Sequence, residues 1–164
     1  MKHAPVCVVT GGSLGIGLAV CKKFAAEGYR VFNLDIRDFA EPVPQAIWHS
    51  CDVKSVGAVN AAISVIAESA GRIDALVSNA GMHFSATIED TSEAELDNVF
   101  NLNVKGAYAA IRATLPFMKS AQSGAIVLMA SDQSVIGKRN SFAYNLSKAA
   151  LASIARTTAL DYAP

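Results

Sequence analysis

Apolar residues form two alternating patterns along the chain. Short uninterrupted apolar runs are typical of strands buried on both faces, and apolar residues that recur every three or four positions indicate one face of a helix. The runs predict strands at residues 6–10, 31–35, 47–51, 75–78 and 125–130. The periodic segments predict helices at residues 15–27, 54–70, 96–118 and 144–162. This alternation indicates an α/β fold with a doubly wound parallel sheet and helices on both faces.

Local sequence signals define two of these predicted helices more closely. In the first, Ile16, Val20 and Phe24 share one face, which we expect to pack on the sheet, and Gly28 is a typical helix stop. Ser92 and Glu95 have the spacing of a capping box ahead of the long helix at 96–118.

Composition narrows the class of protein. The chain has 164 residues, of which 52% are hydrophobic and 17% charged, and it shows no repeat or linker, so we expect a single domain over residues 1–164. The formal net charge is zero, which gives no reason to expect a nucleic-acid partner. Charged or amide residues interrupt every long apolar stretch, so we expect no membrane partner and no membrane span.

Cysteine and histidine usage adds two expectations. Cys7, Cys21 and Cys51 are odd in number and form no CxxC pair, so they are expected to be buried, reduced thiols of a cytoplasmic protein. The three histidines have no ligand-like spacing, and the N-terminus has no signal-peptide pattern, so we expect neither a catalytic metal nor export; the histidines are His3, His49 and His83.

Residues that directly follow a strand are the first candidates for function, because parallel sheets bind ligands at the carboxyl ends of their strands. After the first strand, the segment TGGSLGIG places glycines at positions 11, 15 and 17. Glycines allow a sharp turn and a close approach to phosphate at a helix N-terminus. The loop alone is compatible with either a phosphate cradle or a simple turn.

The residues after the second, third and fourth strands can also be interpreted either as ligand contacts or as structural residues. Asp35 lies 18 residues after Gly17, where a carboxylate can accept both hydroxyls of an adenosine ribose and would repel a 2′-phosphate on it, although Arg37 could partly offset that charge and leaves the choice of cofactor open. Asp52 and Val53 could flank an adenine, or Asp52 could be a helix N-cap. The small residues 79–81 could approach a ligand or form a turn.

Ser131 follows the fifth strand, and Tyr144 and Lys148 lie four residues apart, so they share one face of the last helix. A nearby ammonium favours the phenolate form of a tyrosine, as a base requires. Three further polar residues close to these positions are candidates to touch a substrate: His83, Gln133 and Ser141.

Together these motifs resemble the short-chain dehydrogenase/reductase family, whose fold is of the Rossmann type. The resemblance rests on TGxxxGxG at residues 10–17, SNAG at 78–81, Asn103 in NVKG, Ser131, and YxxxK at Tyr144 and Lys148. It spans the chain and points to the main dehydrogenase branch. SNAG departs mildly from the family's NNAG.

The resemblance implies hydride transfer between a nicotinamide cofactor and the hydroxyl or carbonyl group of a small alcohol or ketone. Tyr144 would be the general acid/base, Ser131 would bind the same oxygen, Lys148 would support the tyrosine and reach the ribose, and Asn103 would hold a water of a proton relay. The implied cofactor, NAD rather than NADP, would lie against Gly11, Ser13, Leu14, Gly15, Ile16, Gly17, Asp35, Ile36, Asp52, Val53, Asn79, Ala80, Gly81, Tyr144 and Lys148.

Family members continue beyond the segment that ends here at residue 164, with further strands, a loop at the nicotinamide and a substrate lid. We therefore expect a C-terminally truncated form, in which the strand at 125–130 is a bare apolar edge. The family also implies a homodimer or homotetramer through the helices at 96–118 and 144–162. Two alternatives stay open: an NADP-dependent ketoreductase of the same fold, and a dinucleotide-binding module without activity.

Overall fold

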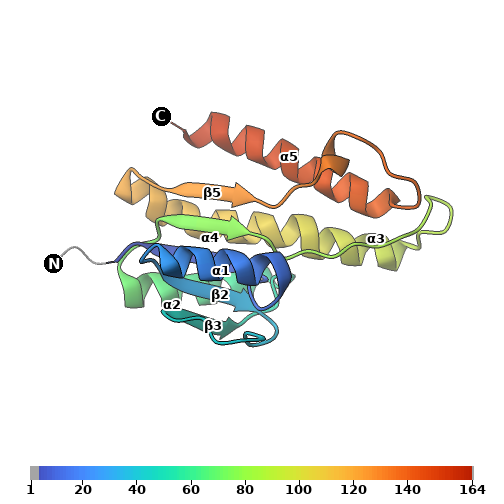
Figure 1. Ribbon diagram of the computed structural model, residues 1–164. Coiled ribbons are helices and arrows are strands. Elements are labelled where there is room, and N and C mark those ends of the chain that lie inside the picture. The colour runs from blue at the N-terminus through green and yellow to red at the C-terminus, as the bar shows by residue number, and fades with distance from the viewer. Residues whose placement is uncertain (1–3, 164) are drawn as a thin grey trace.

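The computed structural model describes residues 4–163 and contains a five-stranded parallel sheet (Figure 1). The strands lie in the order β3-β2-β1-β4-β5, so the chain reverses direction across the sheet between β1 and β4. Their bounds are β1 (Val6–Thr10), β2 (Arg30–Asp35), β3 (Ala46–Ser50), β4 (Ala75–Ser78) and β5 (Ala125–Leu128). The predicted strands are confirmed, with ends that differ by at most two residues.

Five α-helices connect or follow these strands. They are α1 (Gly15–Ala26), α2 (Val56–Ala70), α3 (Glu93–Phe100), α4 (Gly106–Ala121) and α5 (Phe142–Tyr162), with a π-helix η1 (Asn101–Lys105) and a short 3-10 helix η2 (Asp132–Ser134). The predicted capping box is confirmed: the Ser92 side chain accepts from the Glu95 N–H, and the Glu95 carboxylate accepts from the Ser92 N–H.

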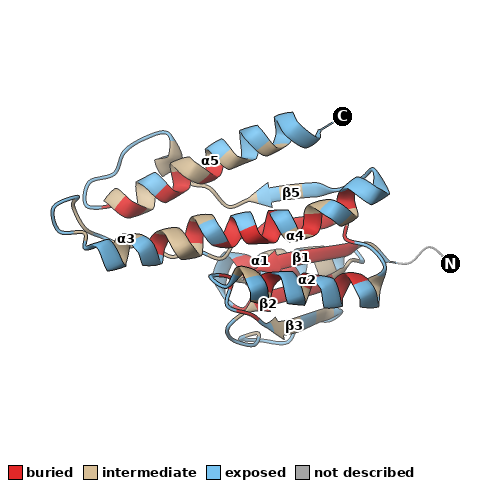
Figure 2. Cartoon of the chain, turned by 180° about the vertical axis from the view of Figure 1, so that it is seen from behind, coloured by how far each residue is buried: buried red, intermediate tan, exposed pale blue. Residues whose placement is uncertain are grey.

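Helices cover both faces of the sheet, as predicted. On one face, Leu18 and Cys21 of α1 pack against Val9 and Val31 of the strands. On the other face, α2 and α4 form a larger core with alternate residues of β1, β2 and β4. All five residues of β1 are buried, and Figure 2 shows this strand at the centre of the molecule. The central strands are buried on both sides, which explains their continuous apolar runs.

The predicted packing face of α1 is partly wrong. Ile16 is 64% exposed, whereas Leu18 and Cys21 are buried and Val20 and Phe24 pack only at the margin of the core. Ile16 lies in the first turn, directly after the glycine-rich loop, and the sheet is packed by the later turns. This leaves an apolar side chain exposed beside that loop.

The helix predicted at 96–118 is confirmed as a helical stretch, but it is not a single regular α-helix. Residues 101–105 form a π-helix between α3 and α4. The wide turn places Asn103, which is 1% exposed, toward the interior. π-helical turns are frequent at functional sites, and apolar periodicity continues across this one, so the pattern gives no sign of the break.

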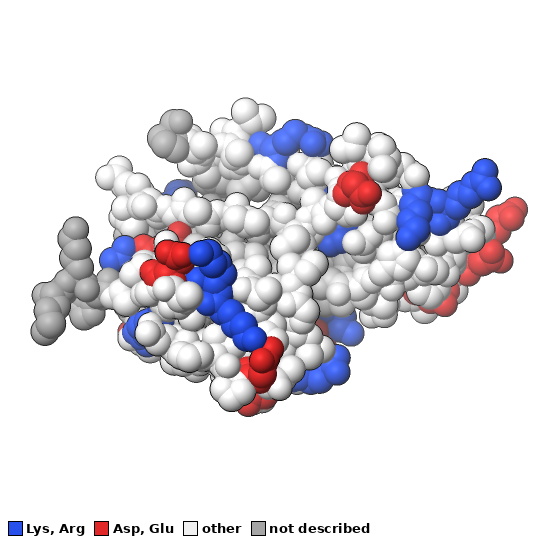
Figure 3. All heavy atoms as spheres, viewed as in Figure 1, with Lys and Arg blue, Asp and Glu red and all other residues white. Residues whose placement is uncertain are grey.

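Four further observations complete the fold. β5 is an edge strand of the described sheet, and its Val127 is 50% exposed, as expected for an apolar edge. The three cysteines are free and buried, which confirms that part of the prediction. Within residues 4–163, no helix is long and apolar enough to span a membrane. Figure 3 shows acidic and basic side chains interspersed over the visible face.

Candidate active site

The carboxyl ends of β1 and β4 are joined by one threonine. Thr10 is paired with Ser78 across the sheet, and its Oγ1 accepts hydrogen bonds from the N–H groups of Asn79 (3.0 Å) and Ala80 (3.1 Å). The Asn79 amide in turn donates to the carbonyl of Gly11 at 2.9 Å. The structure therefore brings the glycine-rich loop and the SNAG segment together, at the point where the strand order reverses and where such sheets bind dinucleotides.

The glycine-rich loop fits a closely approaching phosphate. A Cβ at Gly17 would lie 2.0 Å from the carbonyl oxygen of Gly11, so only glycine is compatible with this packing. Leu14 is the N-cap of α1 but provides no side-chain cap, and residues 14–16 are exposed. The first N–H groups of α1 are thus open, and together with the helix dipole they suit the pyrophosphate of a dinucleotide.

Asn33 of β2 is a site residue that the sequence analysis missed. It is fully buried, its Oδ1 accepts from the Gly12 N–H at 2.7 Å, and its Nδ2 donates to the Ser13 hydroxyl at 2.9 Å. Ser13 donates its own proton to the carbonyl of Arg37 at 2.5 Å. The Ser13 hydroxyl, predicted to face the cofactor, is thus engaged within the protein. A polar side chain in the otherwise apolar run VFNLD was the available signal for Asn33.

Asp35 lies at the end of β2 beside the same loop. Its carboxylate accepts from the N–H groups of Ser13 and Arg37, each at 3.1 Å, and the neighbouring Ile36 is 63% exposed. These bonds fix the carboxylate at the edge of the predicted cofactor site. The position suits recognition of ribose hydroxyls.

Asp52 and Val53 follow β3, and the structure excludes one of the two roles considered for Asp52. The N-cap of α2 is Ser55, whose hydroxyl accepts from the Ala58 N–H, so the helix N-cap considered for Asp52 is wrong. Asp52 is exposed and accepts from the Lys54 N–H at 3.0 Å. Val53 is 4% exposed and packs in the core, where a Cβ at Gly106 would meet it at 3.0 Å.

Tyr144 and Lys148 meet on one face of α5, as their spacing predicts. The Lys148 Nζ lies 5.5 Å from the centre of the Tyr144 ring and donates to the carbonyl of Met129 at 2.6 Å. Lys148 is 5% exposed, and this burial lowers its pKa below the ordinary value of a lysine. A buried ammonium is expensive unless it is hydrogen-bonded, and the Met129 carbonyl supplies that bond.

Asn103 lies beside this pair and connects three segments. Its Oδ1 accepts from the Met82 N–H at 2.8 Å, and its Nδ2 donates to the Met82 carbonyl and to the Ser147 hydroxyl, both at 2.9 Å. A Cβ at Gly81 would lie 3.2 Å from Asn103 Oδ1 and 3.6 Å from Lys148 Nζ. The predicted residues Gly81, Asn103 and Lys148 are therefore neighbours. The supporting roles of Met82 and Ser147 had no signal in the sequence.

The remaining candidates lie around the start of α5. Ser131 is the N-cap of η2: its Oγ donates to the Asp132 carboxylate at 2.8 Å and accepts from the Gln133 N–H at 3.2 Å. Among the described residues, the Gln133 Oε1 is buried without a hydrogen-bond partner. His83 and Ser141, both predicted to touch substrate, are hydrogen-bonded to one another at 3.2 Å.

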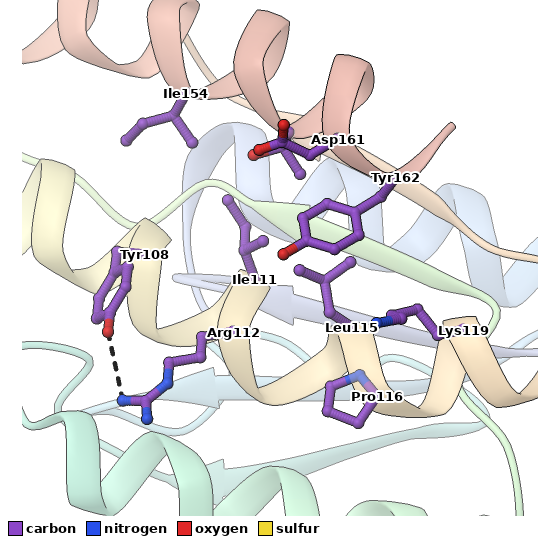
Figure 4. A pocket seen from close by; sticks show the side chains of 10 residues that line it. Tyr108, Ile111, Arg112, Leu115, Pro116, Lys119, Ile154, Asp161 and Tyr162 are labelled. Atoms are coloured by element: carbon purple, nitrogen blue, oxygen red, sulfur yellow. Dashed lines mark hydrogen bonds between the residues drawn. The ribbon is translucent and has the colours of Figure 1, made fainter. Parts of the chain in front are cut away.

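Two apolar grooves lie away from these residues, along α4, α5 and β5. The groove in Figure 4, about 630 Å³ in volume, is lined by Tyr108, Leu115, Ile154 and Tyr162 among others, and none of the predicted site residues lines it. Within residues 4–163, no group of three or more His, Cys, Asp or Glu side chains is placed to hold a metal ion.

Solved structures of similar fold carry either nicotinamide cofactor. An NAD⁺-bound xylitol dehydrogenase matches with a TM-score of 0.90 at 31% identity, covering 100% of this chain and 67% of its own. ElxO with NADP bound matches with a TM-score of 0.92 at 26% identity, covering 98% and 68%.

Two further proteins are more similar to this chain in sequence. A 2-(R)-hydroxypropyl-CoM dehydrogenase of Xanthobacter autotrophicus is 36% identical over 96% of this chain and 68% of its own length. The ligand-free aldohexose dehydrogenase of Thermoplasma acidophilum, also 36% identical, has a TM-score of 0.94 over 99% of this chain. The chain spans 63% of that enzyme. The profile of the short chain dehydrogenase family matches residues 5–164, and the chain belongs to this family.

Proposed function

We propose that this protein is an oxidoreductase that transfers a hydride between a nicotinamide cofactor and the hydroxyl or carbonyl group of a small alcohol or ketone. The observation that carries the proposal is the placement of Lys148, buried and hydrogen-bonded, with its ammonium group 5.5 Å from the Tyr144 ring centre. The alcohol and sugar dehydrogenases among the similar proteins support the same reaction type.

In the proposed mechanism, Tyr144 takes the proton of the substrate hydroxyl in the oxidative direction and returns it in the reductive direction. The positive charge of Lys148 stabilises the phenolate that the oxidative direction requires. Ser131 donates a hydrogen bond to the same substrate oxygen, for which its hydroxyl turns away from Asp132. A bound nicotinamide supplies the hydride chemistry. Asn103 links Met82, the residue directly after SNAG, to Ser147 of α5 and so supports the spacing that these contacts need.

We propose NAD as the cofactor. The loop at residues 11–17 and the open N-terminus of α1 would hold the pyrophosphate, and the Asp35 carboxylate would accept the ribose hydroxyls. The same carboxylate opposes a 2′-phosphate by charge repulsion, and this favours NAD over NADP. Because similar structures hold both cofactors, the relative affinity for the two dinucleotides is the quantity to measure.

The test of the reaction is Tyr144→Phe in the complete translated product of the gene, assayed over a panel of small alcohols and ketones. We expect turnover to fall by at least about 100-fold, in line with the usual contribution of a general acid/base, while calorimetric NAD binding is retained. The matched control is Tyr108→Phe, which removes a hydroxyl from an exposed tyrosine of α4. Turnover by Tyr144→Phe at the wild-type rate would contradict the proposal.

We further propose that the protein forms a homodimer or homotetramer through α4 and α5, in the cytoplasm. Exposed aromatic residues on these helices support the interface: Tyr108 is 47% exposed and Tyr162 is 50% exposed. The buried, free thiols support a reducing compartment. Light scattering after size-exclusion chromatography measures the assembly, and Tyr108→Glu should weaken it.

A further inference from the structure

His83 lies directly against the proposed general acid/base. Its imidazole ring and the Tyr144 ring have centres 4.6 Å apart and planes tilted by 59°. Tilted and edge-to-face pairs at this separation are favourable contacts between aromatic rings. The face of Tyr144 that meets His83 is therefore occupied by protein.

Hydrogen bonds fix the imidazole on both sides. Its Nε2 is 3.2 Å from the Ser141 Oγ, and its Nδ1 is 3.4 Å from the Ser85 Oγ. Ser141 can donate its own proton to the carbonyl of Arg139 at 3.4 Å. The tautomer with its proton on Nε2 satisfies this arrangement, since Nε2–H donates to Ser141 while Nδ1 accepts from Ser85. Both nitrogens are thus used within the protein.

The segment that carries His83 is bound to α5 at two levels. At the start of the helix, Ser141 is 1% exposed, and the Phe142 N–H donates to the Ala86 carbonyl at 3.2 Å. One turn further along, the backbone of Met82 holds Asn103, which donates to Ser147. The adjacent residues 82 and 83 are thus linked to α5 on either side of Tyr144 in the sequence, His83 directly through Ser141 and Met82 through Asn103.

We infer that His83 is a positioning residue, which holds the Tyr144 ring in the orientation that proton transfer requires. This inference rests on the proposed function of Tyr144. Without the imidazole, the Tyr144 ring loses one of its packing partners, and the hydrogen bond that ties this partner to Ser141 is lost with it, so the ring is held less firmly. Small displacements of a reacting group cost large factors in rate. The cofactor loop at residues 11–17 is untouched by this change.

The experiment combines steady-state kinetics with NMR of tyrosine rings in the complete product. We expect His83→Leu to lower kcat about tenfold or more with little change in KM or NAD affinity. We expect His83→Phe, which keeps an aromatic ring, to restore part of kcat. Ser141→Ala should reproduce part of the His83→Leu loss. His49→Leu, which removes a histidine on β3, is the matched control.

The NMR measurement tests the contact independently of turnover, so it stays informative if Tyr144 is not the general acid/base. Tyr144→Phe assigns the Tyr144 ring signals among those of all the tyrosines of the product, which include Tyr29, Tyr108 and Tyr162. His83→Leu should shift these signals, through loss of the imidazole ring current, and leave the other tyrosines in place. Unmoved Tyr144 signals would overturn the inference. An unchanged kcat with a raised KM would also overturn it, because His83 would then bind substrate instead.

Discussion

The substitution Gly17→Ala tests the phosphate loop through one added methyl group. The new Cβ would lie 2.0 Å from the carbonyl oxygen of Gly11 and 2.6 Å from the Nδ2 of Asn79. Even weak C–H···O contacts have carbon–oxygen distances of about 3.3 Å or more. The loop must therefore open by more than about 1 Å, which separates Gly11 from Asn79.

The expected cost has two parts. Forcing a methyl group into a packed site costs about 1–3 kcal/mol, and loss of the hydrogen bond between the Asn79 amide and the Gly11 carbonyl costs about 1 kcal/mol. We expect the free energy of unfolding to fall by about 2–4 kcal/mol. If the bound state is destabilised by about 1.4 kcal/mol more than the free folded state, the Kd for NAD rises about tenfold.

Urea denaturation measures the first quantity and calorimetric titration with NAD the second. The matched control is Gly57→Ala in α2, where the added Cβ meets nothing within 4 Å. This control should leave the Kd unchanged and raise stability by up to about 1 kcal/mol, because alanine favours the helix over glycine. If Gly17→Ala keeps wild-type stability and wild-type affinity, the reasoning about this loop is refuted.

Three further predictions concern single side chains. Asp35→Ser should raise NADP affinity relative to NAD about tenfold or more, measured by titration with both dinucleotides, while the exposed control Asp38→Asn should leave the ratio unchanged. Asn33→Leu leaves the buried Gly12 N–H without its partner and removes one of the two hydrogen bonds of the Ser13 hydroxyl, so denaturation should show a loss of about 1–3 kcal/mol together with weaker NAD binding. Burial raises the pKa of Asp74, but hydrogen bonds from Arg72 and a backbone N–H outweigh it and hold the pKa below 3.8. Its ionised form therefore stabilises the fold above about pH 4, and this contribution is lost as the pH falls through the folded-state pKa. Asp74→Asn should show a stability deficit at pH 7 that narrows below about pH 4, and a deficit independent of pH would contradict this account.

The fold could be predicted from the sequence where burial requires apolar residues at successive positions. β1 and β4 are buried along their whole length, so uninterrupted apolar runs located them to the residue. The packing face of α1 was less predictable, because an apolar residue such as Ile16 can lie beside a ligand loop without packing on the sheet. The π-helix could not be predicted, because apolar periodicity continues across it and its inward-facing Asn103 bonds segments distant in the sequence.

For the site, the sequence located the proposed catalytic residues better than the residues that hold the site in place. Tyr144 and Lys148 share a helix, so their spacing alone placed them together. Asn33 and Thr10 act by hydrogen bonds between strand ends, which depend on register and cannot be read from one strand. Ser13 shows the reverse case: its position in the loop suggested a cofactor contact, and its hydroxyl is bonded inside the protein.

The wide turn at residues 101–105 also limits how the length of this chain can change. Each residue advances an α-helix by about 100° of rotation, at 3.6 residues per turn. Deleting one residue here would turn α4 relative to α3, moving the buried Ala110 and Thr114 toward solvent and the exposed Arg112 toward the core. We therefore expect a single-residue insertion or deletion in this segment to disrupt the packing of α4. The surface loop between β2 and β3 should tolerate the same change.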